Sequence, residues 1–174
     1  MLVDVTRFNL EMTSPDELVA GRASASELDV DRIWGTAAAD ARSTWKRIGE
    51  AHHWDREWSV QDWAAYLSRS DVFSYFVRMR GDVAGMIELE AQPDEVVEIV
   101  TFGLLPEYIG QGIGGHALTL ATTLAWNLEH RTGRGTKRVW VHTNSLDHPH
   151  ALRNYQRRGF RIFRTDHVRR EIPR

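Results

Sequence analysis

Three segments of alternating apolar and polar residues follow one another in the middle of the chain, and short turns separate them. The first runs from Phe73 to Met79 and the second from Val83 to Leu89. Gly81-Asp82 lies between these two and suits a two-residue type II′ hairpin, while Pro93-Asp94-Glu95 predicts a second turn. The third segment, Val96 to Leu105, is apolar on both faces and is expected to be a central strand. Together the segments predict an antiparallel meander.

Helical periodicity follows the meander. A glycine-rich turn leads into a helix predicted from about Gly114 to His130, with a buried stripe that recurs every three or four residues. A further strand is expected over Arg138 to Thr143. Pro149 fits the first turn of a short helix that Gly159 ends, and Phe160 begins a last strand.

The N-terminal part of the chain is less regular. Val3 to Leu10 alternates loosely and predicts a first strand. Apolar residues at helical spacing predict a helix that starts near Asp29 to Asp31 and runs to about Lys46. Ser59, followed three residues later by Asp62, fits the N-cap of a second helix. The resulting order is β, α, α, β, β, β, α, β, α, β, which indicates an α/β (α+β) fold, expected to be one domain over residues 1–174.

Composition excludes several functional classes. The 174 residues are 42% hydrophobic and 26% charged, as in a globular protein. The net charge of −2 argues against nucleic-acid binding, which needs a basic surface. No cysteine is present, which excludes disulfides, thiolate zinc sites and a cysteine nucleophile. The N-terminus has no apolar signal region, and no apolar run approaches the roughly 20 residues of a membrane-spanning helix, so we expect a cytoplasmic protein.

The turn between the central strand and the long helix contains Gly110, Gly112, Gly114 and Gly115. Glycine lets the backbone approach a ligand closely, and the free amides of the following helix N-terminus attract phosphate. A tight turn with nothing bound is the alternative. The spacing also satisfies G-x-G-x-x-G, but a dinucleotide site needs a parallel βαβ unit and an acid roughly 20 residues further on. This chain has the basic segment Arg134 to Arg138 there, which disfavours a nicotinamide or flavin site.

The segment Glu98 to Gly114 resembles the acetyl-coenzyme A signature of the GNAT N-acetyltransferases, in which a strand ends near a proline and (Q/R)-x-x-G-x-(G/A) opens a helix. Gly112 and Gly114 occupy the two small-residue positions, and Ile109 stands at the Q/R position. Downstream, Ala151, Tyr155 and Gly159-Phe160 resemble the family's N-x-x-A-x-x-x-Y-x-x-x-G-F segment, with His148 in place of the asparagine. The two signatures cover roughly residues 96 to 163, and the stretch around Asn144 is similar to that of a bacterial subgroup.

This resemblance implies the GNAT acyl-CoA N-acyltransferase fold, a mixed and mostly antiparallel sheet flanked by helices. It also implies an N-acetyltransferase with acetyl-CoA as co-substrate and the amine of a small molecule or peptide as acceptor. No nucleic-acid or membrane partner is implied, and a homodimer is left open. A non-catalytic acyl-CoA-binding or regulatory module of the same fold is the alternative. The implied acetyl-CoA contacts are Phe102, Gly103, Leu104, Ile109, Gly110, Gln111, Gly112, Ile113, Gly114, Gly115, Asn144, His148 and Ala151.

Acetyl transfer needs a deprotonated amine, a stabilised oxyanion and a protonated thiolate. Glu98 is the only charged residue on its strand, so burial should raise its pKa and favour a general base, as the family often has at this strand position. A solvent-facing or arginine-paired glutamate is the alternative, and Glu88 and Glu90 are weaker candidates for the base. By resemblance, Tyr155 would protonate the departing thiolate where the strands splay, unless it is a core tyrosine. Backbone amides of Phe102 to Leu104 would hold the oxyanion.

Trp54, Asp55 and Trp58 are the expected acceptor contacts, because the first two helices and their connection form one wall of the acceptor site in the GNAT fold. The tryptophans could stack on a flat or cationic group, and Asp55 could pair with an amine. The alternative is that the tryptophans wedge the helices onto the sheet.

Histidines and an aspartate are also close together in the sequence, at His142, Asp147, His148 and His150. Zinc would need three or four converging ligands, each oriented by a hydrogen bond to a further group. The first of these residues is expected at a strand end and the next two at a helix start, so no metal is predicted.

Overall fold

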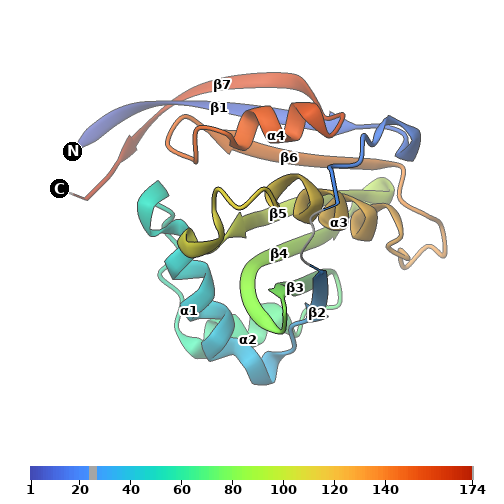
Figure 1. Ribbon diagram of the computed structural model, residues 1–174, viewed down its shortest axis with the longest axis horizontal. Helices are drawn as coiled ribbons and strands as arrows, with labels where there is room; N and C mark the ends of the chain where they lie inside the picture. Colours follow the sequence, from blue (N-terminus) through green and yellow to red (C-terminus); the bar gives the residue numbers. More distant parts are fainter. Residues whose placement is uncertain (24–26, 174) are drawn as a thin grey trace.

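The computed structural model describes residues 1–23 and 27–173. Among these residues, one mixed sheet of seven strands has the order β2-β3-β4-β5-β6-β1-β7 (Figure 1). The strands are β1 (Leu2–Met12), β2 (Leu28–Arg32), β3 (Val72–Met79), β4 (Asp82–Gln92), β5 (Val96–Leu104), β6 (Arg138–Asn144) and β7 (Arg161–Glu171). The α-helices are α1 (Ala38–Gly49), α2 (Val60–Leu67), α3 (Gly114–Trp126) and α4 (Ala151–Arg157). The expected class, a mixed and mostly antiparallel sheet flanked by helices, is confirmed.

The sheet opens at its centre, between β5 and β6. These two strands are parallel, whereas the other neighbouring pairs of the described sheet are antiparallel. Their pairing ends at Ile99↔Val141, although β5 continues to Leu104 and β6 to Asn144. Beyond that point β5 stays paired with β4, and β6 stays paired with β1. The C-terminal ends of β5 and β6 therefore separate, which leaves a gap between two halves of the sheet.

The predicted meander is confirmed, since β3, β4 and β5 are antiparallel neighbours. The turn between β3 and β4 differs from the expected Gly81-Asp82. Met79 pairs with Asp82, so the loop residues are Arg80 and Gly81, with φ angles of 53° and 85°. Positive φ at both central positions is the mark of a type I′ turn, whose twist matches that of the flanking strands.

Helices cover both faces of the sheet (Figure 1). Met86 and Ile87 are adjacent on β4 but belong to different apolar clusters, because successive strand residues point to opposite faces. Ile87 packs in the cluster that holds α3 and α4, and Met86 packs in the cluster that holds α1 and α2. The gap between β5 and β6 thus lies between two helical layers.

The segment expected to begin the first helix, Asp29 to Asp31, is instead part of the edge strand β2. Leu28 and Val30 alternate with the two aspartates, and the segment pairs with β3 from Leu28↔Met79 to Arg32↔Tyr75. The expected helix starts later, at Ala38. A five-residue strand carries too few alternations to separate it from a helix start, and exposed acids are common on sheet edges.

Other boundaries differ by a few residues. The helix α3 ends at Trp126 rather than His130, and α4 begins at Ala151, after Pro149. The last strand continues to Glu171, since β7 pairs with β1 along most of its length. No helix in the described parts of the chain is both long and apolar enough to cross a membrane.

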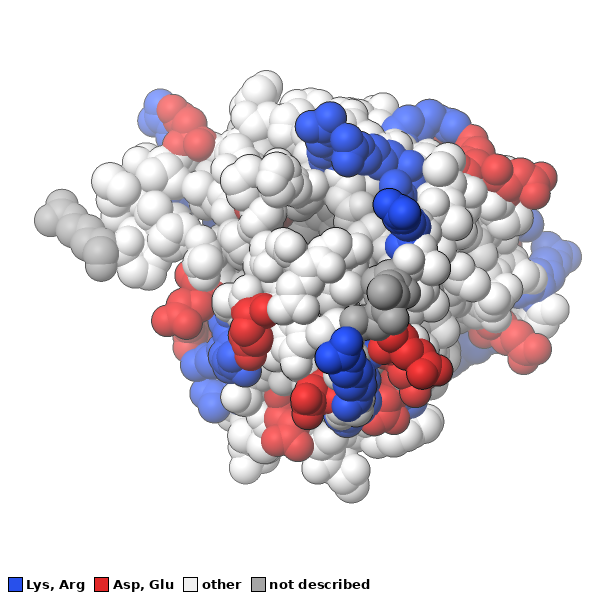
Figure 2. All heavy atoms as spheres, in the orientation of Figure 1, with Lys and Arg blue, Asp and Glu red and all other residues white. Residues whose placement is uncertain are grey.

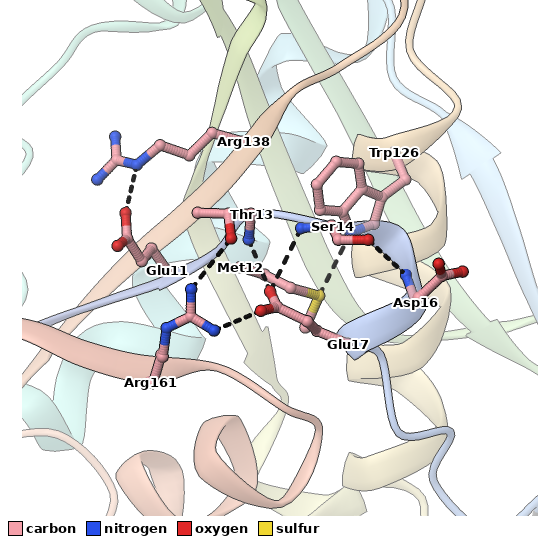
Figure 3. A network of polar contacts seen from close by, with 9 residues as sticks. All are labelled: Glu11, Met12, Thr13, Ser14, Asp16, Glu17, Trp126, Arg138 and Arg161. Carbon is pink, nitrogen blue, oxygen red and sulfur yellow. Dashed lines mark hydrogen bonds and ion pairs between the residues drawn. The ribbon is translucent and has the colours of Figure 1, made fainter.

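A polar network fixes the end of β1 beside the end of α3 (Figure 3). Ser14 and Glu17 form a capping box around a 3₁₀ turn, and Glu17 Oε2 also accepts a 2.7 Å hydrogen bond from the backbone N–H of Thr13. The indole nitrogen of Trp126 lies 3.4 Å from the sulfur of Met12. The N-terminal strand is thereby held against the helix that follows the glycine-rich turn.

Candidate active site

A cavity of about 1030 Å³ lies where β5 and β6 separate. Most of its lining comes from four parts of the chain: the ends of β5 and β6, the glycine-rich turn with the start of α3, the helix α4, and α1 with its connection to α2. Of the residues proposed from the sequence, those that line it are Trp54, Asp55, Trp58, Phe102, Gly103, Leu104, Ile109, Gly110, Gly112, Gly114, Gly115, Asn144, His148, Ala151 and Tyr155. Segments distant in the sequence therefore converge on one site.

The glycine-rich turn forms one end of the cavity. Gly110 and Gly112 have φ angles of 81° and 75°, in the left-handed region that favours glycine. A Cβ at either position would meet no atom within 4 Å, so the space beside the backbone is open. The helix α3 begins at Gly114, and its first N–H groups have no partner within the helix. This arrangement suits a phosphate group.

Two residues of the turn do not line the cavity. The side chain of Gln111 points back and donates a 2.7 Å hydrogen bond to the carbonyl of Glu107. Ile113 is 2% exposed and belongs to the apolar interior. Contacts of these two residues with a ligand are thus limited to their backbone.

Basic side chains lie beside the turn. A Cβ on Gly115 would lie 2.2 Å from Nη1 of Arg158, so glycine at this position makes room for the guanidinium. The Nε of Arg158 is buried and has no hydrogen-bond partner among the described residues. Arg153 and Arg157 also line the cavity, and Figure 2 shows basic side chains gathered over α4. The donors available here suit a group with several negative charges, such as a phosphate.

Tyr155 projects from α4 into the cavity. It is 5% exposed, and its ring lies edge-on to Phe102 with 6.4 Å between centroids. Burial, with a smaller contribution from the charge of Asp147, raises the pKa of its hydroxyl well above the usual value. No described residue forms a hydrogen bond with this hydroxyl. The group is therefore protonated at neutral pH and free to donate to a ligand.

Glu98 lies behind the cavity wall rather than on it. Burial raises the pKa of its carboxyl group, and a 2.8 Å hydrogen bond from Gln92 opposes this effect. Its Oε1 lies 3.8 Å from Nε2 of His142, which does line the cavity. Burial lowers the pKa of His142 to about 4, so this imidazole is neutral at pH 7. His142 thus stands between Glu98 and the cavity.

The segment Phe102 to Leu104 forms the β5 wall, and α1 covers part of it. A Cβ on Gly103 would lie 2.4 Å from Cγ2 of Ile48, so glycine is needed for this close approach. β5 also carries a bulge just before this segment, since Thr101 pairs with Glu88 and Ile99 with Leu89. A bulge changes the direction in which the following side chains point. Here the bulge lies just after Ile99, where the pairing of β5 with β6 ends.

The residues after β6 form the opposite wall. Asp147 accepts hydrogen bonds from the hydroxyl of Thr143 at 2.8 Å and from the backbone N–H of Asn144 at 2.9 Å. The Asn144 side chain in turn accepts from the N–H of Leu146 at 2.9 Å. His148 is exposed to the cavity, and burial together with nearby His150 and His52 lowers its pKa. The backbone N–H groups of Asn144 and Leu146 are thus satisfied within the turn, and that of Ser145 donates to the carbonyl of Thr6 on β1.

The connection between α1 and α2 supplies the predicted acceptor residues. Asp55 is 81% exposed and its carboxylate lies 3.3 Å from Arg170, so it already has a cationic partner. Trp54 packs 5.2 Å from the ring of Trp45, and Trp58 lies 5.5 Å from the ring of Trp63. The tryptophans therefore pack this connection against α1 and α2, as one sequence-based interpretation expects, and they also line the cavity.

Sequence reasoning missed several residues that line the cavity. The most prominent are Arg56, Thr101, Arg153, Arg157 and Arg158, while Asp147 was considered only as a metal ligand. Arg153 and Arg157 are four residues apart on α4, and this spacing could have predicted a basic face on that helix. Among the described residues, no group of three or more His, Cys, Asp or Glu is placed to hold a metal ion.

Comparison with known proteins identifies the fold family. The sequence model of the acetyltransferase (GNAT) family matches residues 35–160. No curated protein matches the sequence. The match covers the helices α1 and α2, the meander, the glycine-rich turn and α4, which are the parts that build the cavity.

Solved structures share the arrangement. A GCN5-related N-acetyltransferase from Kribbella flavida aligns with 97% of this chain and 58% of its own, at 22% identity and a TM-score of 0.66. Another from Sphaerobacter thermophilus aligns with 95% of this chain and 50% of its own, at 13% identity and a TM-score of 0.70. An aminoglycoside acetyltransferase from an uncultured soil metagenomic sample, solved with sisomicin, aligns with 74% of this chain and 85% of its own, at 13% identity and a TM-score of 0.57. The chain thus spans little more than half the length of the first two proteins.

Proposed function

Because the chain belongs to the GNAT acetyltransferase family, we propose that it transfers an acetyl group from acetyl-CoA to the amine of a small molecule or peptide. The observation that carries this proposal is the position of Tyr155. Its protonated hydroxyl faces the same cavity as the glycine-rich turn and as the β5 segment Phe102 to Leu104. Acetyl transfer from acetyl-CoA needs a site for the pyrophosphate, a proton donor for the departing thiolate and backbone amides for the oxyanion.

Acetyl-CoA would lie along the gap between β5 and β6. Its pyrophosphate would bind the amides of Gly110 to Gly115 and the N-terminus of α3. The cationic groups of Arg153, Arg157 and Arg158 would balance the remaining phosphate charge. The thioester would then reach the β5 wall, where Phe102 to Leu104 present backbone groups that no longer pair with β6.

The reaction would need an oxyanion site, a base for the amine proton and a proton donor for the thiolate. Backbone amides of Phe102 to Leu104 would stabilise the oxyanion as the amine attacks the thioester carbon. The proton of the attacking amine would pass by way of His142 to Glu98, whose raised pKa suits a base. Tyr155 would give its proton to the departing thiolate of CoA. Direct transfer needs no covalent enzyme intermediate, which agrees with a chain that has no cysteine.

Isothermal titration with acetyl-CoA tests the first step, with NADH and NADPH as controls. We expect micromolar binding of acetyl-CoA alone. A panel of amines, including aminoglycosides and amino acids, then tests turnover through the release of free thiol from acetyl-CoA. Binding without any thiol release would instead support a non-catalytic acyl-CoA-binding module, and tight NADH binding would contradict both proposals.

A further inference from the structure

The guanidinium of Arg56 sits inside a cage of four aromatic rings. Its central carbon lies 4.7 Å from the ring centroid of Trp45, 4.5 Å from Trp58, 4.9 Å from Trp63 and 5.3 Å from Tyr66. The rings come from α1, from α2 and from the connection between them. They hold the planar group in place and attract its charge through their π-systems.

A buried carboxylate holds one edge of the same guanidinium. Nη1 of Arg56 lies 2.9 Å and 3.0 Å from the two oxygens of Glu88, which is fully buried. Thr101 also donates a hydrogen bond to Glu88, and the indole nitrogen of Trp45 donates to Thr101 at 3.2 Å. Each oxygen of Glu88 therefore has a partner, and the ion pair carries no net charge.

The other edge of the guanidinium carries no protein partner among the described residues. Arg56 is 14% exposed and lines the cavity beside Thr101 and Trp58. Nε and Nη2 form no hydrogen bond with the described residues, and neither atom is closed off from solvent. These two N–H groups point the same way, which is the fork that a carboxylate accepts in a bidentate manner.

We propose that Arg56 binds the carboxylate of the acceptor, and that the acceptor is an amino acid. This inference rests on the proposed acetyltransferase function. Thr101, which bonds Glu88, immediately precedes Phe102, where the oxyanion is expected. A carboxylate on Arg56 would therefore bind on the same part of β5 as the proposed oxyanion site, which suits an acceptor whose amine is one or two carbons from its carboxylate. A cationic acceptor group fits this position less well, because it would have to displace Arg56 from a buried carboxylate.

The proposal is tested by comparing each of the common amino acids with its carboxamide as the acceptor. Acetyl-CoA is kept saturating, and the rate is measured as the release of free thiol. We expect kcat/KM for the acid to exceed that for the carboxamide at least tenfold. Arg56→Lys keeps the charge beside Glu88 but loses the fork, so it should reduce this ratio at least tenfold. The matched control is Arg32→Lys, since Arg32 also stacks on three rings, Trp34, Phe73 and Tyr75, but does not line the cavity. A ratio that is unaffected by Arg56→Lys, or a preference for carboxamides, overturns the proposal.

A binding measurement separates this site from the transfer reaction. Phenylacetate is a carboxylate with no amine, and the tryptophans of the cage report its binding by fluorescence. We expect saturable quenching by phenylacetate, none by phenylacetamide, and loss of the response in Arg56→Lys. The double variant Arg56→Gln/Glu88→Gln, which leaves no unpaired buried charge, should also lose it. No quenching in the wild-type protein, or quenching that survives in both variants, overturns the carboxylate site. Quenching without any acetyl-CoA binding supports this site and contradicts only the proposed function.

Discussion

The indole nitrogen of Trp54 donates a 2.9 Å hydrogen bond to Oδ1 of Asp147. Trp54 belongs to the connection between α1 and α2, and Asp147 belongs to the turn after β6, so this bond joins two walls of the cavity. The second oxygen of Asp147 accepts from Thr143 and from the N–H of Asn144. One carboxylate therefore joins the proposed acceptor wall to the wall that carries α4.

Asp147→Asn should weaken this junction. An asparagine has one acceptor oxygen instead of two, so in either amide orientation the indole N–H of Trp54 or the N–H of Asn144 faces an NH2 group and loses its acceptor. We expect the free energy of unfolding to fall by about 1–2 kcal/mol. Urea unfolding measures the change. Trp54→Phe removes one bond and keeps most of the packing, so its effect should be smaller, and an equal or larger loss in Trp54→Phe would contradict the role of Asp147.

Tyr155→Phe tests the proposed proton donor. The substitution keeps the ring that packs against Phe102 and removes only the hydroxyl. We expect kcat to fall roughly 10²- to 10⁴-fold, the usual contribution of a general acid, with acetyl-CoA affinity nearly unchanged. The control is Tyr75→Phe, on β3 and outside the cavity. An unaltered rate in Tyr155→Phe would remove this tyrosine from the chemistry.

Gly112→Asp tests the phosphate site at the turn. The new side chain brings bulk and negative charge to a place that is open and next to a helix N-terminus. Acetyl-CoA binding, measured by titration, should be lost. Gly133→Asp is a close control, because Gly133 has a φ of 71° against 75° for Gly112, and no atom would lie within 4 Å of its Cβ either. Both variants pay a similar backbone strain, so equal binding by the two would exclude a phosphate site at Gly112.

Much of the fold could be predicted because its periodicities are long. The alternating β3 and β4 and the apolar β5 each carry enough residues for the period to be read, and β5 is central as its two apolar faces indicate. The edge strand β2 was missed because Leu28 and Val30 alone carry its alternation. The hairpin residue Arg80 was missed because its positive φ depends on strand register, which neighbouring residues do not determine.

The candidate site was predictable where the family motifs mark it, and at Trp54, Asp55 and Trp58 in the connection between the first two helices. The glycine-rich turn and Tyr155 line the cavity, as the motifs imply. The cage around Arg56 was not predictable, because its rings and Glu88 come from elements whose relative placement depends on tertiary packing. The position of Glu98 behind His142 has the same cause, since it follows from the pairing of β5 with β6.

The pKa of His142 makes stability depend on pH. The unfolded chain gains a proton as the pH falls below about 6.5, whereas the folded chain does not until about 4. The folded state binds fewer protons in this range, so the free energy of unfolding should fall as the pH falls from 6.5 to 4. Because 34% of the side chain is exposed, we expect a loss of only about 1–2 kcal/mol. The raised pKa of Glu98 makes the free energy of unfolding rise as the pH falls, which opposes the effect of His142. A comparison of the wild-type protein with a His142 variant therefore isolates the contribution of His142.

Urea unfolding at pH 7, 6, 5 and 4.5 measures this dependence. In His142→Gln the loss of stability between pH 7 and 4.5 should be smaller than in the wild-type protein. His167→Gln replaces an exposed histidine on β7 and is the control for general effects of the substitution. Equal slopes in His142→Gln and the wild-type protein would show that His142 is protonated alike in the folded and unfolded states.

Gly103→Ala tests whether α1 fixes the β5 wall. The added methyl group would lie 2.4 Å from Cγ2 of Ile48, so one of the two elements must move. We expect a loss of about 1–3 kcal/mol in the free energy of unfolding, as for other overpacked sites. Ile48→Leu removes the branch that clashes and nearly conserves volume, so alone it should cost less than about 1.5 kcal/mol. In the double variant the two changes should compensate, with a coupling of about 0.5–3 kcal/mol in a double-mutant cycle. Additive losses would mean that β5, and with it the proposed oxyanion site, is positioned independently of α1.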